Sequence, residues 1–255
     1  MKKILKGFLR SLGYTIAPII VQAVEEDTLS ISKEEMERFM YEGIHLHRYA
    51  PWLTDEKFKQ LHNKIKDYTL VDAYRCYELF DIVQRLNNID GDIIEIGVWR
   101  GGTSAVIATA LQFVNSNKML YLCDTFSGVV KAGDFDIRYK GGEHSDTSEQ
   151  LVTDLLTSLQ LKNFKLLKGI FPEDTGSAVE NKTFSLCHID VDVYQSGVDI
   201  VEWIYAKLSK GGVLVFDDYG FRGCNGITHL VNKLRQDEKW LYIYNLNGHA
   251  ILIKR

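Results

Sequence analysis

Three carboxylates that could bind a metal stand at the ends of two apolar segments. A strand predicted at 184–190 ends at Asp190, and a strand predicted at 212–217 ends at Asp217, which Asp218 follows. Parallel strands place their carboxyl ends at one edge of a sheet, so these side chains are expected to meet there. Carboxylates brought together without a partner repel each other and lose hydration. A hard divalent cation relieves that repulsion, so the pattern predicts a Mg²⁺ site.

The roles of individual acids in this cluster stay open. Side chains alternate along a strand, so Asp217 and Asp218 are expected to point in different directions. One of them would bind the cation directly, while the other would support it or cap the next helix. Asp192 lies past the end of its strand, where it could simply cap the helix predicted to begin near Tyr194.

A second candidate site is the glycine-rich turn between a strand predicted at 92–96 and a helix predicted at 103–113. Its glycines would let the backbone approach a ligand that the helix N–H groups face. The spacing differs from the G-x-G-x-x-G pattern that binds a dinucleotide pyrophosphate, and Glu95 before the turn would repel phosphate. An acid at this position suits a cationic ligand without phosphate, such as S-adenosylmethionine.

Asp124 ends the next predicted strand, 119–124. An acid at that place in a nucleotide-binding sheet can accept hydrogen bonds from both hydroxyls of a ribose. The alternative is a solvated loop acid or a helix cap. The first interpretation adds Asp124 to the donor site.

The order of the predicted elements indicates how these sites are held. From residue 92 onward strands alternate with helices, and the chain closes with a hairpin through Asn247-Gly248. We expect an α/β fold with a doubly wound, mostly parallel, seven-stranded Rossmann-like sheet. Residues 1–70 are predicted as a helical extension and residues 71–255 as the catalytic domain. The predicted strands are 92–96, 119–124, 164–168, 184–190, 212–217, 240–244 and 249–253, and the predicted helices include 55–66, 72–88, 103–113, 147–160, 194–208 and 224–236.

Several of these segments together resemble one enzyme family, the sugar O-methyltransferases of the TylF/MycF type, which include macrocin, mycinamicin and novobiocin tailoring enzymes. The run Gly97-Val-Trp-Arg-Gly-Gly102 is the most specific of them. The first 65 residues or so show no convincing match. The matching stretches are 68–71, 95–102, 124–128, 169–175, 188–194 and 216–220, followed by Gly223-Cys224.

This resemblance implies a class I methyltransferase fold, S-adenosylmethionine as methyl donor, and Mg²⁺-dependent transfer to a sugar hydroxyl. It also implies that Asp190, Asp217 and Asp218 hold the metal, with Asp190 doubling as general base. Macrolide and aminocoumarin sugars both occur among the family's acceptors, so the acceptor stays open between a glycan and a glycosylated natural product. The expected donor contacts are Thr69, Glu95, Gly97, Trp99, Gly102, Thr103, Ser104, Asp124 and Phe171.

The loop after the second strand and two aromatic residues have two interpretations each. His144 either touches the substrate, as part of a loop that could close over the site, or is a surface histidine. Asp146 is predicted to cap the following helix. Trp99 and Phe171 either stack on the adenine or close the core. His188, in a predicted core strand, is expected to be a hydrogen-bonded buried histidine that could support Asp190.

Composition limits the remaining possibilities. The net charge of −4 argues against nucleic acid as a partner. The four cysteines are scattered, which favours buried free thiols in a cytoplasmic protein. A basic amphipathic helix predicted at residues 2–13 would either lie on the inner face of a membrane or dock on protein. A homodimer is expected as well.

Two other functions remain as alternatives. A nicotinamide-dependent oxidoreductase could use a similar sheet, but the G-x-G-x-x-G pattern is missing. A small phenolic or catechol acceptor could replace the sugar, because that chemistry uses a similar metal layout. A binding protein without catalytic activity is disfavoured because the acids and turn glycines are all present.

Overall fold

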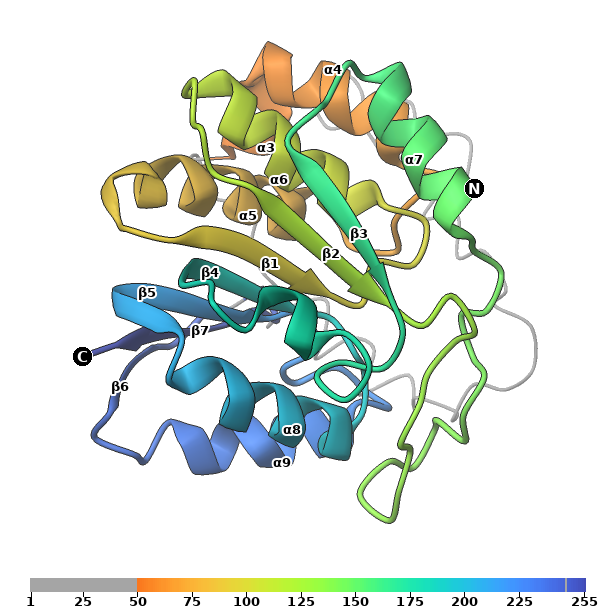
Figure 1. Cartoon of the computed structure of the whole chain (residues 1–255), viewed down its shortest axis with the longest axis vertical. Coiled ribbons are helices and arrows are strands. Elements are labelled where there is room, and N and C mark those ends of the chain that lie inside the picture. The colour runs from red at the N-terminus through yellow and green to blue at the C-terminus, as the bar shows by residue number, and fades with distance from the viewer. Residues whose placement is uncertain (1–49, 246) are drawn as a thin grey trace, which may run out of the picture. The chain divides into compact units, whose positions relative to one another are not determined.

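The computed structural model describes residues 50–245 and 247–255 (Figure 1). The chain divides into two units, Met1–His45 and Leu46–Arg255, and all of the described residues belong to the second. The helix predicted at residues 2–13 lies outside the described residues. Among the helices in the described part, none is long and apolar enough to cross a membrane.

Within the described residues, one sheet of seven strands has the order β3-β2-β1-β4-β5-β7-β6 (Figure 1). Neighbours from β3 to β5 are parallel, whereas β7 is antiparallel to both β5 and β6. The order reverses at β1 and β4, and ligands of such sheets bind at the carboxyl ends beside this switch point. The predicted doubly wound sheet with an antiparallel edge is confirmed. The strands are β1 (Asp92–Ile96), β2 (Leu120–Asp124), β3 (Phe164–Lys168), β4 (Phe184–Ile189), β5 (Leu208–Phe216), β6 (Trp240–Ile243) and β7 (Ala250–Lys254).

The helices between the strands form where the sequence predicts them, with ends shifted by a few residues. The segment predicted as one helix over 72–88 ends as an α-helix at Arg85 and continues as a 3₁₀ turn, η1 (Leu86–Asn88). The helices are α3 (Pro51–Thr54), α4 (Glu56–Ile65), α5 (Ala73–Arg85), α6 (Gly102–Phe113), α7 (Glu149–Ser158), α8 (Tyr194–Tyr205) and α9 (Asn225–Leu234), with a second 3₁₀ turn, η2 (Gly176–Val179).

Alternation along the strands divides the hydrophobic core into two layers. Ile93 and Val215 belong to the layer beneath α4, α5, α6 and α7, whereas Ile94 and Phe216 belong to the layer beneath α8 and α9. Figure 1 shows these two groups of helices on opposite faces of the sheet. Alternation also decides which face each polar strand residue serves.

The described part of the predicted helical extension packs into the first of these layers. Phe58, Leu61 and Ile65 of α4 are buried in the same core as α5 and α6. Asp55 caps this helix by accepting hydrogen bonds from the amides of residues 57 and 58, both at 3.0 Å. The helical segment from 51 to 65 therefore shares a core with the predicted catalytic domain.

Candidate active site

A cavity of about 280 Å³ lies at the carboxyl ends of β1, β2, β4 and β5. It is the place where a sheet of this topology binds its ligand. Most of the site residues expected from the sequence line it, although they come from distant parts of the chain. The lining includes Thr69, Gly97, Trp99, Thr103, Asp124, His144, Phe171, Asp190, Asp217 and Asp218.

The three acids predicted to hold a metal come together in this cavity. Carboxylate oxygens of Asp190, Asp217 and Asp218 lie within 4.8 Å of one another. Burial, followed by the charges of the other two acids, raises the pKa of Asp190 well above its usual range. Burial and the charges of Asp192 and Asp217 do the same to Asp218. The raised pKa values show that the nearby protein groups do not balance the charge that these two acids would carry when ionised.

Asp217 is held much more firmly than the other two acids. Arg75 of α5 donates to its Oδ2 at 2.5 Å, and His249 Nε2 lies 3.0 Å from its Oδ1. Burial would raise the pKa of Asp217, but His188, His249 and Arg75 around it outweigh burial and keep the pKa well below its usual range. Asp217 is thus a fixed, ionised group.

Asp218 points to a different set of partners. It accepts a hydrogen bond from the backbone amide of Asp192 at 3.1 Å, on the side of α8 and α9. Arg75 and His249 meet Asp217 on the side of α5. The two neighbouring carboxylates therefore have different partners, and both still border the cavity.

Asp192 does not cap α8, contrary to the simplest expectation. The N-cap of α8 is Val193, and the amide of Tyr194 donates instead to Asp136 at 3.0 Å. The backbone of Asp192 is left-handed, with φ of 63°, which turns its side chain toward the cavity. There its carboxylate lies 3.5 Å from Cys224 Sγ.

The chemistry of the acid cluster fits a hard divalent cation. All three donors are carboxylate oxygens, the ligands that Mg²⁺ prefers. Among the described residues, the Asp190 carboxylate accepts no hydrogen bond, and Asp218 accepts only the one from Asp192. Free lone pairs and surplus negative charge thus coincide at one point. Asp190, Asp217 and Asp218 are the residues that would hold the ion.

Glu95 lies beneath the cavity instead of facing it. Its side chain is fully buried, and it accepts hydrogen bonds from the Ser104 hydroxyl and from His188 Nδ1, the latter at 2.9 Å. Burial lowers the pKa of His188, but Asp217 and Glu95 outweigh burial and raise it to about 10. Neither Glu95 nor Ser104 borders the cavity, because strand alternation turns Glu95 toward α6, the helix to which Ser104 belongs.

His188 is a hydrogen-bonded buried histidine, as the sequence suggests, but it supports Glu95 instead of Asp190. Its other ring nitrogen, Nε2, lies 3.9 Å from Asp217 Oδ1 and has no hydrogen-bond partner among the described residues. His188 therefore stands between the acid beneath the donor turn and the acid cluster.

Two turn glycines serve chain packing. A Cβ on Gly97, which has φ of +88°, would lie 1.7 Å from the carbonyl oxygen of Asp190. Gly102 donates from its amide to the carbonyl of Tyr68 at 2.9 Å, and its missing side chain makes room for Thr69. Gly102 therefore packs against Tyr68 and Thr69 and does not border the cavity, unlike Thr69 itself.

Asp124 lines the cavity at the end of β2, and its carboxylate accepts three backbone hydrogen bonds. Val98 and Trp99 donate to Oδ2 at 2.7 and 2.9 Å, and Phe126 donates to Oδ1 at 2.6 Å. These bonds fix the glycine-rich turn against β2. A carboxylate offers about four lone-pair positions, so one remains for a ligand hydroxyl.

The loop between β2 and α7 borders the cavity through His144. His144 Nε2 lies 4.0 Å from Asp192 Oδ2, and its ring meets that of Trp99 edge-on. Asp146 does not cap α7, because Ser148 does so. Asp146 instead accepts hydrogen bonds from the indole of Trp99 at 2.8 Å and from Arg100, which ties the loop to the donor turn.

The two aromatic residues expected near adenine have different surroundings. Trp99 is half-buried at the cavity wall, where its backbone is left-handed with φ of 46°. Phe171 is 4% exposed and packs edge-on against Trp203 at 4.8 Å between ring centroids. Both still border the cavity, so each could contribute to a ligand contact.

The residues that surround Asp217 were not predicted from the sequence. Arg75, Glu78 and His249 are charged or polar groups that are buried or half-buried around Asp217. Their sequence signals are weak: Arg75 lies three residues after the helix cap Asp72, and His249 begins the last predicted strand. Only the folded chain shows that these positions converge.

The sheet order and the cavity at its switch point define the chain as a class I methyltransferase fold. A family model described as macrocin-O-methyltransferase (TylF) matches residues 18–241. The chain therefore belongs to this family, and the resemblance seen in its motifs is confirmed.

Relatives and solved structures agree with this assignment. Demethyldecarbamoylnovobiocin O-methyltransferase of Streptomyces niveus is 28% identical over 62% of this chain, and the match spans only 62% of that enzyme. Mycinamicin III 3''-O-methyltransferase of Micromonospora griseorubida is 26% identical over 79% of this chain and 86% of its own length. The structure of the O-methyltransferase NovP has a TM-score of 0.63, 24% identity, and coverage of 73% of this chain and 82% of its own, which supports the fold.

Proposed function

We propose that this protein transfers a methyl group from S-adenosylmethionine to a sugar hydroxyl of a glycan or a glycosylated natural product, with Mg²⁺ bound at Asp190, Asp217 and Asp218. The observation that carries the proposal is the convergence of these three acids in one cavity with Asp124 and the glycine-rich turn. A relative from Streptomyces olivaceus is named as an O-methyltransferase of a rhamnosyl-tetracenomycin, which supports the sugar acceptor.

The donor would occupy the β1–β2 side of the cavity. Asp124 would accept a ribose hydroxyl, with Gly97 allowing close approach along the turn. Trp99 and Phe171 would contact the adenine, and Thr69 and Thr103 would border the donor. Glu95 would act from below by holding Ser104 of α6 in place, with its charge offset by the paired His188 imidazole.

The acceptor hydroxyl would approach the acid cluster. Bound Mg²⁺ would supply a Lewis acid that lowers the hydroxyl pKa and orients its oxygen. Methyl transfer requires that oxygen in line with the S–CH₃ bond, so the carboxylates at the ends of β4 and β5 set the approach direction. Asp190 is the proposed proton acceptor because its carboxylate borders the cavity and accepts no hydrogen bond from the described residues.

Asp192 is the second candidate for proton acceptor. It borders the same cavity, lies 4.0 Å from His144, and is not among the three acids assigned to the ion. Burial raises its pKa above the usual range, although Tyr139 and His144 act in the opposite direction. A proton could pass from Asp192 to His144 and then to solvent.

Methyl transfer by Asp190→Asn and Asp192→Asn variants tests this assignment. The loss of a general base lowers turnover by about 10²–10⁴-fold. The proposal predicts this loss in Asp190→Asn, with affinity for S-adenosylhomocysteine unchanged. A much larger loss in Asp192→Asn would move the base to that residue. Full activity in both variants would contradict acid-assisted transfer. The acceptor class is tested separately with the wild type, and methylation of catechols in preference to glycosides would contradict a sugar acceptor.

Homodimerisation, cytoplasmic location and membrane contact through residues 2–13 stay predictions. Light scattering of the full chain would test the dimer, liposome co-sedimentation the membrane contact, and cell fractionation the location.

A further inference from the structure

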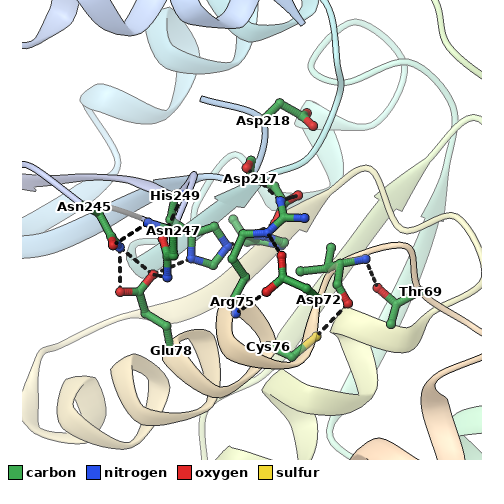
Figure 2. Close-up of polar contacts among 12 residues, drawn as sticks. Thr69, Asp72, Arg75, Cys76, Glu78, Asp217, Asp218, Asn245, Asn247 and His249 are labelled. Carbon is green, nitrogen blue, oxygen red and sulfur yellow. Dashed lines mark hydrogen bonds and ion pairs between the residues drawn. The ribbon is translucent and has the colours of Figure 1, made fainter. Parts of the chain in front are cut away.

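The turn between β6 and β7 converges on a single carboxylate of α5 (Figure 2). Asn245 Nδ2 donates to Glu78 Oε1 at 2.6 Å and to Oε2 at 2.7 Å, and Asn247 Nδ2 donates to Oε2 at 2.9 Å. His249 Nδ1 lies 2.6 Å from the same Oε2. Three side chains of one short turn thus meet Glu78.

The other ring nitrogen of His249 reaches the acid cluster. His249 Nε2 lies 3.0 Å from Asp217 Oδ1, and the imidazole is fully buried. Arg75, one turn before Glu78 on α5, binds the other oxygen of Asp217. Helix α5 therefore controls both oxygens of Asp217, one directly through Arg75 and one through Glu78 and His249, as Figure 2 shows.

We propose that Glu78 and His249 are positioning residues that fix the Asp217 carboxylate for metal binding, so the β6–β7 turn forms part of the metal site. This inference rests on the proposed function. A hydrogen bond from a neighbouring group leaves a carboxylate able to bind a cation while fixing its rotation. Partners of this kind commonly change metal affinity by about 10–100-fold when they are removed.

A purely structural role for the same contacts predicts a different outcome. In that case Glu78 would only fasten the turn to α5, and every lost bond would lower stability without changing the ion's affinity. Asn245 separates the two roles, because it makes two bonds to Glu78 and its described hydrogen bonds do not reach Asp217.

The test measures Mn²⁺ affinity by electron paramagnetic resonance, using the full chain and Mn²⁺ as a probe for Mg²⁺. His249→Leu is expected to weaken Mn²⁺ binding by about 10–100-fold, while affinity for S-adenosylhomocysteine stays unchanged. His249→Gln, which keeps an amide donor, should recover most of the affinity. Asn245→Ala should lower the unfolding temperature and bind Mn²⁺ like the wild type.

Three results would overturn the proposal. Wild-type Mn²⁺ affinity in a folded His249→Leu variant would leave His249 a packing residue; if that variant does not fold, Glu78→Gln provides the same comparison. Equal loss of Mn²⁺ affinity in Asn245→Ala and His249→Leu would assign the effect to a general disturbance of the turn and not to the contact between His249 and Asp217. Absence of Mn²⁺ binding by the wild type would instead remove the metal site of the proposed function, and the positioning role with it.

Discussion

The β1–β2 side of the cavity and the β4–β5 side satisfy their polar groups in different ways. On the first side, Asp124 is held by backbone amides and Glu95 by Ser104 and His188 beneath the surface. On the second side, side chains from distant parts of the sequence surround Asp217, and Asp190 accepts no hydrogen bond from the described residues. The acids of the first side are held by hydrogen bonds from the protein itself. Those of the second side lack enough partners to balance their charges, and a bound cation would supply the missing balance.

This difference indicates which substitutions should affect which property. Changes on the β4–β5 side should alter ion binding and turnover, because its carboxylates depend on charged partners. Changes on the β1–β2 side should alter donor affinity or the folding of the turn.

A large effect on stability is expected from Arg75, which is 4% exposed and binds both Asp217 and Asp72. Arg75→Met leaves a buried carboxylate without its partner, so the free energy of unfolding should fall by about 3–5 kcal/mol. Arg85→Met on the same helix removes an exposed pair with Asp81 and should cost about 0–1 kcal/mol. Urea denaturation measures both, and equal losses would contradict the special role of Arg75.

Gly97 joins the two sides, because its turn packs against the carbonyl of Asp190. Gly97→Ala should be severely destabilising, since the new Cβ meets that oxygen at 1.7 Å in addition to the strain of its positive φ. Gly142→Ala, at φ of +90° in open space, should cost only the strain, about 1–2 kcal/mol. Thermal unfolding that ranks the two variants equally would show that the close packing at Gly97 is relaxed in solution.

Asp124 and Glu95 should separate donor binding from support beneath the site. Asp124→Ala is expected to weaken binding of S-adenosylhomocysteine by about 1.5–3 kcal/mol, the value of a hydrogen bond to a charged group. Glu95→Gln should lower the unfolding temperature more than the affinity, because Glu95 is buried and does not border the cavity. Calorimetry that finds the larger affinity loss in Glu95→Gln would reverse this assignment.

The smallest effect concerns the thiols. All four cysteines are free and buried, and burial raises the pKa of Cys76, Cys123, Cys187 and Cys224 above the usual value. Native protein at pH 8 should react slowly with a thiol reagent, whereas all four thiols of the unfolded protein should react rapidly. Rapid labelling of one thiol in the native state would point to Cys123 or Cys224, the two cysteines that border the cavity.

The sequence was sufficient for the sheet and for the acids at its edge. Strand periodicity and the position of Asp190, Asp217 and Asp218 after apolar segments follow directly from the chain. The partners of these acids could not be predicted, because Arg75 and His249 reach Asp217 across 142 and 32 residues. Strand alternation alone could have shown that Glu95 points away from the cavity. Glu95 lies two residues after Ile93, so both side chains point to the face of the sheet that α4–α7 cover.

Local capping was predicted less well than topology. Asp146 and Asp192 both stand just before helices, the usual position of a cap, yet Ser148 caps α7 and Asp136 binds the first amide of α8. A side chain that finds a partner across the fold is no longer available for the nearest helix. Such competition depends on tertiary contacts, and a single sequence does not show these.

The central claim is that the β4–β5 acids bind a divalent cation that the reaction needs, while donor binding does not depend on it. The most direct measurement is methyl transfer by the full chain after EDTA treatment and again with added Mg²⁺, with S-adenosylhomocysteine binding measured in parallel. We expect EDTA to abolish turnover, Mg²⁺ to restore it, and donor-product affinity to stay constant. Full turnover in EDTA would contradict the account.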